Sequence, residues 1–377
     1  MTTSYLSSDT VRLTSIDEVV AAIPYHLGFG PHRSIVVHAL RGRQLVGTAR
    51  VDLPPTDLMD DVADSVMTAL IRGGRPDAIM VIGFEDQSGE ALACLLRCAE
   101  VAQRRRLRVH SAALVCDGQL AEVDLRAAGS SGRMLATPGR PRAVVESSRV
   151  PAVADLVGRG RAPLPSRADL AARLEPLPES TQVIGHLGTF SGSPDRDLRL
   201  WGRYLRAAGS SAAAQPSPAV VARLVGSLSD RMLRDGLLAW FCPGLLPLDG
   251  LDPAYTSRIR THLPPPSAHA EDAAVRGHRR EQRELLIALV QRTPTSWPAG
   301  VADICTVLAQ QAWFDGDGAM ASIAVERALD HAPEHTLARL LGRLIGAGIR
   351  SGELADAISV ERSAQTLAHD PDSPAGD

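Results

Sequence analysis

The sequence contains no lysine and no asparagine, and all 40 of its lysine-plus-arginine residues are arginines. Without lysine there is no Schiff base for pyridoxal-phosphate or aldolase chemistry. The phosphate-anchoring lysine of P-loop proteins and kinases is excluded as well. Without asparagine there is no site for N-glycosylation. Both residues have AT-rich codons, so their absence indicates a GC-rich bacterial genome.

Cysteine, aromatic residues and net charge are also scarce. The 5 cysteines form no C-x-x-C pair, which argues against a zinc ribbon and favours buried thiols in a reducing compartment. With 3% aromatic residues and a net charge of -3, we do not expect binding to nucleic acid. No apolar run reaches the roughly 18 residues of a membrane span, and the N-terminus does not resemble a signal peptide. We therefore expect a cytoplasmic protein that contacts no membrane.

The length of 377 residues predicts two to three domains of about 150 residues each. We expect an α/β domain over residues 10–126 and a linker and loop over 127–166, where glycine, proline and arginine interrupt a polar segment. A helical domain is expected over 167–350 and a disordered tail over 370–377.

The first part of the chain begins with helix and hairpin signals. Ser15 and Glu18 fit a capping box, and we expect Pro24 to end the short helix that they start. The β-branched segment 34–40 and the segment 44–53 are separated by a short turn, which predicts a hairpin.

Alternating helices and strands follow the hairpin. Residues 78–84 are apolar on both faces, and amphipathic segments lie before and after them. Residues 109–116 predict another buried strand, and Asp117-Gly118 is a strong two-residue hairpin turn. This order predicts an α/β N-terminal domain with a mixed, mostly parallel sheet.

The second half shows helical periodicity and no strand alternation. Amphipathic segments cover 167–174, 196–208, 219–241 and 270–292. Residues 308–333 resemble a single tetratricopeptide repeat unit, with Gly316 at the turn, small residues in the second helix and Pro333 at the end. We therefore expect an all-α, partly tetratricopeptide-like C-terminal domain.

Several motifs resemble an actinobacterial family known as domain of unknown function 4192. They are Pro24 to Phe29, Ser34 to Val37 and Ala49 to Pro54, with Val225 to Leu238 and Trp313 to Arg327 in the second half. The resemblance covers most of residues 10–350. The sequence departs from the family where Cys116-Asp117-Gly118 runs straight into the next strand without a tryptophan- and cysteine-rich segment. The resemblance implies the architecture and leaves the activity open.

Acidic residues near the predicted strand ends are candidates for ligand binding. Asp52 and Asp86, with Glu85 and Asp117 nearby, could hold Mg²⁺ at the carboxyl edge of the sheet, or they could cap helices and turns. Arg50 lies two residues before Asp52, on the same face of its strand. The pair fits an anion site, an acid/base pair or, as we expect, an internal ion pair.

Two further groups of residues are candidates. His26 and His32 flank a glycine-rich loop, which together with Tyr25 makes a chemically mixed segment suited either to a ligand or to a structural turn. The repeat-like hairpin and the helix after it suggest an interaction surface. Its candidate residues are Trp313, Asp317, Arg327 and Arg339. Asp317 belongs to a turn that lacks the spacing of a calcium loop.

No group of reactive side chains forms a recognised catalytic motif, so we expect no catalytic residue, metal or cofactor. The leading hypothesis is a non-catalytic protein-interaction or scaffold protein with an unidentified protein partner. The alternative is a metal-dependent enzyme or nucleotide-binding protein with its site at the strand ends. A second alternative is a nucleic-acid accessory protein.

Overall fold

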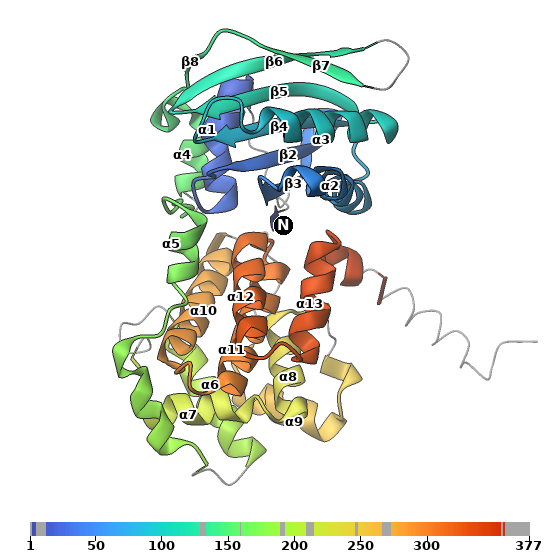
Figure 1. Ribbon diagram of the computed structural model, residues 1–377. Helices are drawn as coiled ribbons and strands as arrows, with labels where there is room; N and C mark the ends of the chain where they lie inside the picture. Colours follow the sequence, from blue (N-terminus) through green and yellow to red (C-terminus); the bar gives the residue numbers. More distant parts are fainter. Residues whose placement is uncertain are drawn as a thin grey trace, which may run out of the picture.

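The protein is described from a computed structural model. It describes residues 2–4, 13–128, 133–158, 160–188, 193–208, 215–245, 248–265, 273–355 and 357–358, so the predicted tail 370–377 lies outside the described residues. Figure 1 shows a sheet with its helices stacked on a helical region, with α5 (Arg167–Ala172) running between them. The expected α/β region followed by a helical region is confirmed.

The sheet is mixed, with strand order β1-β3-β2-β4-β5-β6-β7 and with β8 paired to β6. The strands are β1 (Thr2–Ser4), β2 (Ser34–Arg41), β3 (Gln44–Asp52), β4 (Ala78–Glu85), β5 (Arg108–Cys116), β6 (Gln119–Ala127), β7 (Met134–Pro138) and β8 (Arg142–Ala143). Both predicted hairpins form. Gly42 turns between β2 and β3 with φ of 59°, and Asp117 and Gly118 turn between β5 and β6 with φ of 47° and 70°.

The mixed sheet is as expected, but its pairs are mostly antiparallel rather than mostly parallel. Among the described strands, β4 and β5 form the one parallel pair. Both β3 and β4 are antiparallel to β2 and therefore run in the same direction with β2 between them. The reason is that the connection through α2 (Met59–Gly74) carries the chain past β2 and places β4 on its free side.

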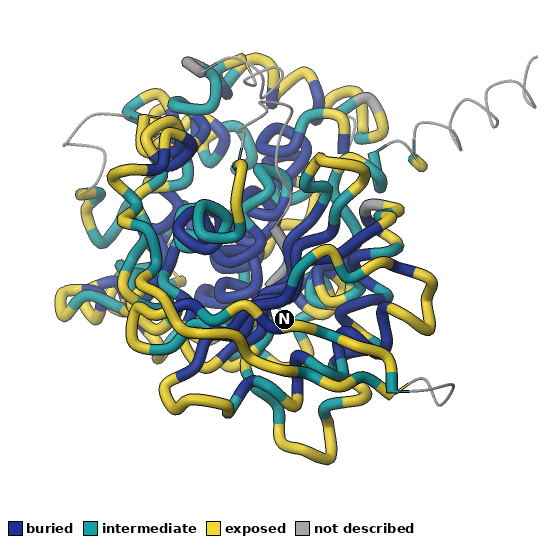
Figure 2. Tube along the Cα trace, turned by 90° about the horizontal axis from the view of Figure 1, so that it is seen from above, coloured by how far each residue is buried: buried dark blue, intermediate teal, exposed yellow. Residues whose placement is uncertain are grey.

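Helices cover both faces of the sheet. Helices α2 and α3 (Leu92–Arg104) pack on one face, and α1 (Ile16–Leu27) packs on the other. The cluster on the α1 side continues from Val36 and Ile82 into the helical region without a break. Figure 2 shows buried segments running through the middle of the molecule and exposed segments around its periphery. The α1 side of the sheet and the helical region therefore share a hydrophobic core, whereas a separate cluster lies between the sheet and helices α2 and α3.

Helix α1 starts at the predicted residue but ends later than expected. The Ser15 hydroxyl accepts a hydrogen bond from the Glu18 amide, and the Glu18 carboxylate accepts one from the Thr14 amide at 2.6 Å. The prediction that Pro24 ends the helix is wrong. Proline removes one amide donor, but its carbonyl still accepts from the amide of Gly28, where φ of 81° ends the helix.

Residues 127–166 were expected to be a linker and loop, but their described part contains regular structure. Strands β7 and β8 both pair with β6, and α4 (Pro151–Gly158) packs beside α1. Leu164 forms an isolated parallel bridge with Phe29. Strand β7 escapes prediction because it lies at the edge of the sheet, is largely exposed and so lacks an apolar alternation.

The helical region contains α5 and eight longer named helices within the described residues. They are α6 (Pro194–Arg206), α7 (Pro218–Ser227), α8 (Arg231–Phe241), α9 (Pro253–His262), α10 (Ala273–Arg292), α11 (Pro298–Phe314), α12 (Gly318–His331) and α13 (Thr336–Gly346). Short 3₁₀ segments lie at Thr56–Leu58, Ser147–Arg149, Pro178–His186 and Leu248–Gly250. No helix in the described ranges combines the length and apolar character needed to cross a bilayer.

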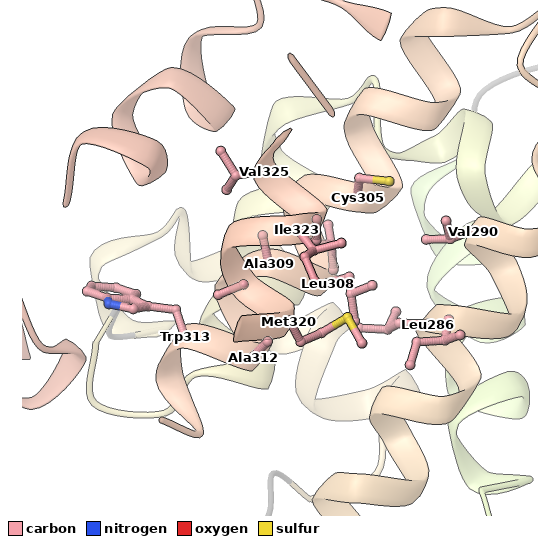
Figure 3. Close-up of a cluster of buried hydrophobic side chains, with 14 of the residues drawn as sticks. Leu286, Val290, Cys305, Leu308, Ala309, Ala312, Trp313, Met320, Ile323 and Val325 are labelled. Carbon is pink, nitrogen blue, oxygen red and sulfur yellow. The ribbon is translucent and has the colours of Figure 1, made fainter. Parts of the chain in front are cut away.

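Helices α11 and α12 form the predicted hairpin, with Gly316 at the turn at φ of 77°. In Figure 3, Leu308 of α11 lies against Ile323 of α12, while Leu286 of α10 approaches from the other side. Nearly every residue of α11 from Gly300 to Trp313 is buried. The helix is therefore the centre of a bundle, enclosed on all sides by its neighbours.

Candidate functional site

Arg50, Asp52 and His32, three of the predicted ligand residues, meet where β3 ends. The Arg50 guanidinium forms an ion pair with Asp52 at 2.7 Å and donates to the His32 carbonyl at 3.1 Å. It also lies 5.6 Å from the centre of the Phe29 ring. The Arg50 side chain is 5% exposed and that of Asp52 is 74% exposed. Of the roles that the spacing left open, the geometry matches the internal ion pair, which fastens the loop before β2 to the end of β3.

Asp86 does not join this group. Ser34 of β2 pairs with Asp52 on one side and with Phe84 of β4 on the other. The ends of β3 and β4 are therefore two strand spacings apart, about 10 Å. Asp52 is instead engaged by Arg50, and β2 lies between its strand and that of Asp86. In the described part of the chain, no cluster of three or more histidine, cysteine or acidic side chains could hold a metal.

The acids that follow β4 organise their own loop. The Glu85 carboxylate accepts hydrogen bonds from the amides of Gly89 and Ala91 at 3.0 and 2.9 Å. Glu90 accepts from the Asp86 amide and pairs with Arg33 at 3.3 Å. These hydrogen bonds hold the pKa of Glu90 below its ordinary value. The arrangement matches the helix- and turn-capping role that the sequence left as the alternative to metal binding.

Tyr25 and His26 point to different surroundings. Tyr25 donates to the Ser147 hydroxyl at 3.2 Å. His26 is buried under the sheet, and no hydrogen-bond partner of its ring lies among the described residues. Burial, aided by the charge of Arg161, lowers the pKa of His26 to about 4. Neighbouring His38 lies 2.7 Å from the Thr48 hydroxyl, and burial lowers its pKa to about 3. Both rings are neutral at pH 7 and belong to the core.

The predicted interaction surface is largely internal. Trp313 is 7% exposed and donates its indole N–H to the Ile349 carbonyl. Asp317 caps α12 by accepting from the Met320 amide and pairs with Arg283 at 2.7 Å. Arg327 pairs with Glu175 at 3.0 Å, and Arg339 alone of the four is largely exposed. These side chains hold the helices together, so contact of this hairpin with a partner stays a prediction.

The helical region carries a different site, a groove between α6 and α9. Its lining residues are Arg196, Arg199, Arg203, Arg206, Thr261 and His262, and it encloses a volume of about 360 Å³. We call it the arginine groove. Figure 1 places α6 and α9 in the part of the helical region that is far from the sheet. A volume of this size falls within the range of small ligand sites.

The fold of α6 explains why the arginines share one face. Leu198, Trp201 and Leu205 are buried against neighbouring helices, and the Trp201 indole donates to the Ser227 hydroxyl at 3.0 Å. The arginines alternate with these residues at steps of three, four and three, so they lie on the exposed face of the same helix. Packing of the apolar face therefore displays the arginines to solvent.

Gly202 brings α9 close enough to complete the groove. A β-carbon at this position would lie 2.0 Å from the His262 carbonyl oxygen, so only glycine permits the crossing. The same carbonyl accepts a hydrogen bond from Arg206 at 2.7 Å. Arg206 therefore satisfies the C-terminal end of α9 while its charge remains in the groove.

The nearby carboxylates face basic side chains other than the four arginines of the groove. Asp195 lies 3.5 Å from Arg258 and 3.6 Å from His262, and Asp197 pairs with Arg223 at 2.6 Å. Arg199 donates to the backbone carbonyl of Asp195. Within the described ranges, none of the four groove arginines forms an ion pair with a carboxylate. The groove therefore carries a concentrated positive charge.

Sequence reasoning recognised 196–208 only as an amphipathic segment. The three-four-three arginine spacing was a visible signal, because it predicts one charged face on a helix. The approach of α9, more than 50 residues later, and the engagement of Asp195 and Asp197 with other partners depend on the tertiary fold. Because of these tertiary contacts, the arginines remain available to a ligand. A local sequence pattern cannot predict such contacts.

Comparison with known proteins places the chain in a family. No curated protein and no solved structure matches it. The model of the family described as "Domain of unknown function (DUF4192)" matches residues 17–245 and 269–351, which together are most of the chain. The match includes strands β2 to β8 and helix α6 with its four arginines, whereas α9, which supplies Thr261 and His262 to the groove, lies between the two matched ranges. The chain therefore belongs to the DUF4192 family.

Proposed function

We propose that the protein is a non-catalytic interaction protein that holds an acidic segment of a partner protein in the arginine groove. The groove is the observation that carries this proposal. Four exposed guanidinium groups lie on one helix face, without carboxylate partners in the described part of the chain.

The charge of the groove supports binding of an anion. Four like charges on one helix face repel one another, and an acidic ligand replaces that repulsion with attraction. The planar fork of a guanidinium group matches a carboxylate with two parallel hydrogen bonds. A cleft lined by one sign of charge also raises the rate at which opposite charges arrive.

The lining residues support binding rather than chemistry. The Thr261 hydroxyl donates to the Ser257 carbonyl of its own helix. His262 faces Asp195, which also contacts Arg258. Guanidinium groups remain protonated at pH 7 and do not exchange protons with a substrate. These side chains recognise charge and shape.

A cytoplasmic location and an actinobacterial source are part of the same proposal. The five cysteines are free thiols, and four of them are buried, as suits a reducing compartment. The absence of lysine and asparagine supports a GC-rich genome. The α11–α12 hairpin with its Gly316 turn supports the tetratricopeptide-like interpretation of this segment.

The test is binding of a fluorescently labelled oligoglutamate peptide, followed by anisotropy. We expect the double variant Arg196→Gln/Arg203→Gln to bind at least about tenfold more weakly, because each lost charged hydrogen bond contributes about 1.5 kcal/mol. Added salt should weaken the wild-type complex, because these charges face solvent.

The matched control is Arg43→Gln/Arg72→Gln, which removes two exposed arginines from the sheet region. This variant has the same net charge as the groove variant and should bind the peptide as the wild type does. Equal affinities for the wild type and the groove variant would exclude the groove as the binding site.

A further inference from the structure

Resting on the function proposed above, we propose that the arginine groove recognises a phosphorylated segment of the partner protein. Phosphate fits the charge, the shape and the hydrogen-bond donors of the groove better than carboxylate does.

The charge of the groove favours phosphate over carboxylate. The four arginines contribute four positive charges, and the carboxylate of Asp195 beside the groove is shared by Arg258 and His262. A glutamate side chain contributes one negative charge and two acceptor oxygens. A phosphoserine contributes about −1.5 to −2 charges and three acceptor oxygens at pH 7. Two phosphates therefore come close to balancing four arginines, which would otherwise need four carboxylates.

The spacing of the arginines along α6 also suits phosphate. From Arg196 to Arg206 the helix advances ten residues, about 15 Å at 1.5 Å per residue. The four guanidinium groups therefore form a row along one helix face, beside Thr261 and His262 of α9. A phosphate presents three acceptor oxygens at one point, so a single phosphate can accept from the forks of two neighbouring arginines.

The lining residues favour a phosphorylated protein over nucleic acid as the ligand. Single-stranded nucleic acid is held by aromatic side chains that stack on its bases, as well as by positive charge. The lining of the groove contains no tryptophan, tyrosine or phenylalanine, and the whole chain carries a net charge of -3. The four lining arginines occupy about three turns of one helix, which suits a short phosphorylated segment.

The experiment compares two labelled peptides of equal charge and identical flanking sequence. One carries two phosphoserines and the other carries four glutamates in the same region. We expect the phosphopeptide to bind at least about tenfold more tightly, and Arg196→Gln/Arg203→Gln to remove this preference. Arg43→Gln/Arg72→Gln should preserve it. Arg203→Lys keeps the charge without the fork and should lose about threefold for the phosphopeptide.

Each outcome decides between the two proposals. Equal binding of both peptides overturns phosphate recognition and leaves the acidic-partner function intact. Binding of neither peptide overturns both. Tighter binding of a single-stranded oligonucleotide than of the phosphopeptide, with the same dependence on Arg203, overturns the protein-partner assignment in favour of nucleic acid. All variants should keep the wild-type unfolding temperature, because the substituted side chains are exposed.

Discussion

The charged groups of the sheet region and those of α6 serve opposite purposes. At the sheet, Arg50, Glu85 and Glu90 are each paired with a neighbouring strand end, loop amide or arginine. On α6, the groove arginines are exposed and lack carboxylate partners among the described residues. Charges that are paired within the protein stabilise the fold. Charges without a carboxylate partner remain available to a ligand. Residue type alone does not distinguish the two.

The largest expected effect is a loss of stability at low pH, caused by two buried neutral histidines of the sheet region. The ordinary pKa of His26 and His38 is 6.5, and burial lowers it to about 4 and about 3 in the folded state. The unfolded state therefore takes up protons first as the pH falls below 6.5, and stability decreases. Each histidine should cost up to about 1.4 kcal/mol per pH unit once the pH is well below 6.5, so we expect a total loss of about 3 kcal/mol between pH 6.5 and 5.

Urea unfolding at several pH values measures this loss. In the variant His26→Leu one titrating group is gone, and the slope between pH 6.5 and 5 should fall by about half. A slope unchanged from the wild type would mean that His26 is not held neutral by the fold. Peptide binding by the groove should be unaffected in the variant, because His26 lies under the sheet.

The next effect concerns the close approach of α6 and α9 at Gly202, on which the groove depends. Gly202→Ala places a methyl group against the His262 carbonyl and should destabilise the protein by about 2 kcal/mol. It should also weaken peptide binding, because α9 has to move. The matched control is Gly277→Ala in α10, where a β-carbon meets nothing within 4 Å. That change should stabilise the protein by up to about 1 kcal/mol. Thermal unfolding of both variants decides the matter, and a Gly202 variant as stable as the control would contradict the close crossing.

A smaller effect is expected at the end of β4. Glu85→Ala removes the acceptor for the buried Ala91 amide and should cost about 1.5 kcal/mol without changing peptide affinity. Glu85→Gln retains an acceptor oxygen and should recover part of the loss. If Glu85→Ala weakened peptide binding as strongly as the groove variant does, the division between engaged and available charges would fail.

The smallest expected effect on stability belongs to the groove. Arg196→Gln/Arg203→Gln should change the free energy of unfolding by less than about 0.5 kcal/mol, because exposed side chains without ion pairs contribute little. Chemical denaturation of this variant beside Glu85→Ala sharpens the comparison. A large loss of stability would show that these arginines have a role inside the fold.

Much of the sheet could be predicted because its signals are local. Apolar runs gave β4 and β5, and Asp117-Gly118 gave the β5–β6 turn with positive φ at both residues. Features set by distant contacts could not be predicted. The placement of β4 beside β2 and the exposed edge strand β7 depend on which partners the fold supplies. The site divides in the same way: the arginine spacing is visible in the sequence, but the burial of Trp313 and the engagement of Asp195 are not.

The enclosed position of α11 has a consequence for synthesis of the chain. Helices α7, α8 and α10 precede it in the sequence but pack around it. While the ribosome is still extending the polypeptide, these helices lack the element that fills their centre. The helical region therefore completes its folding only after residues 298–314 have left the ribosome, whereas β2 to β6 can already pair. Premature termination before α11 would leave a formed sheet attached to helices with exposed apolar faces.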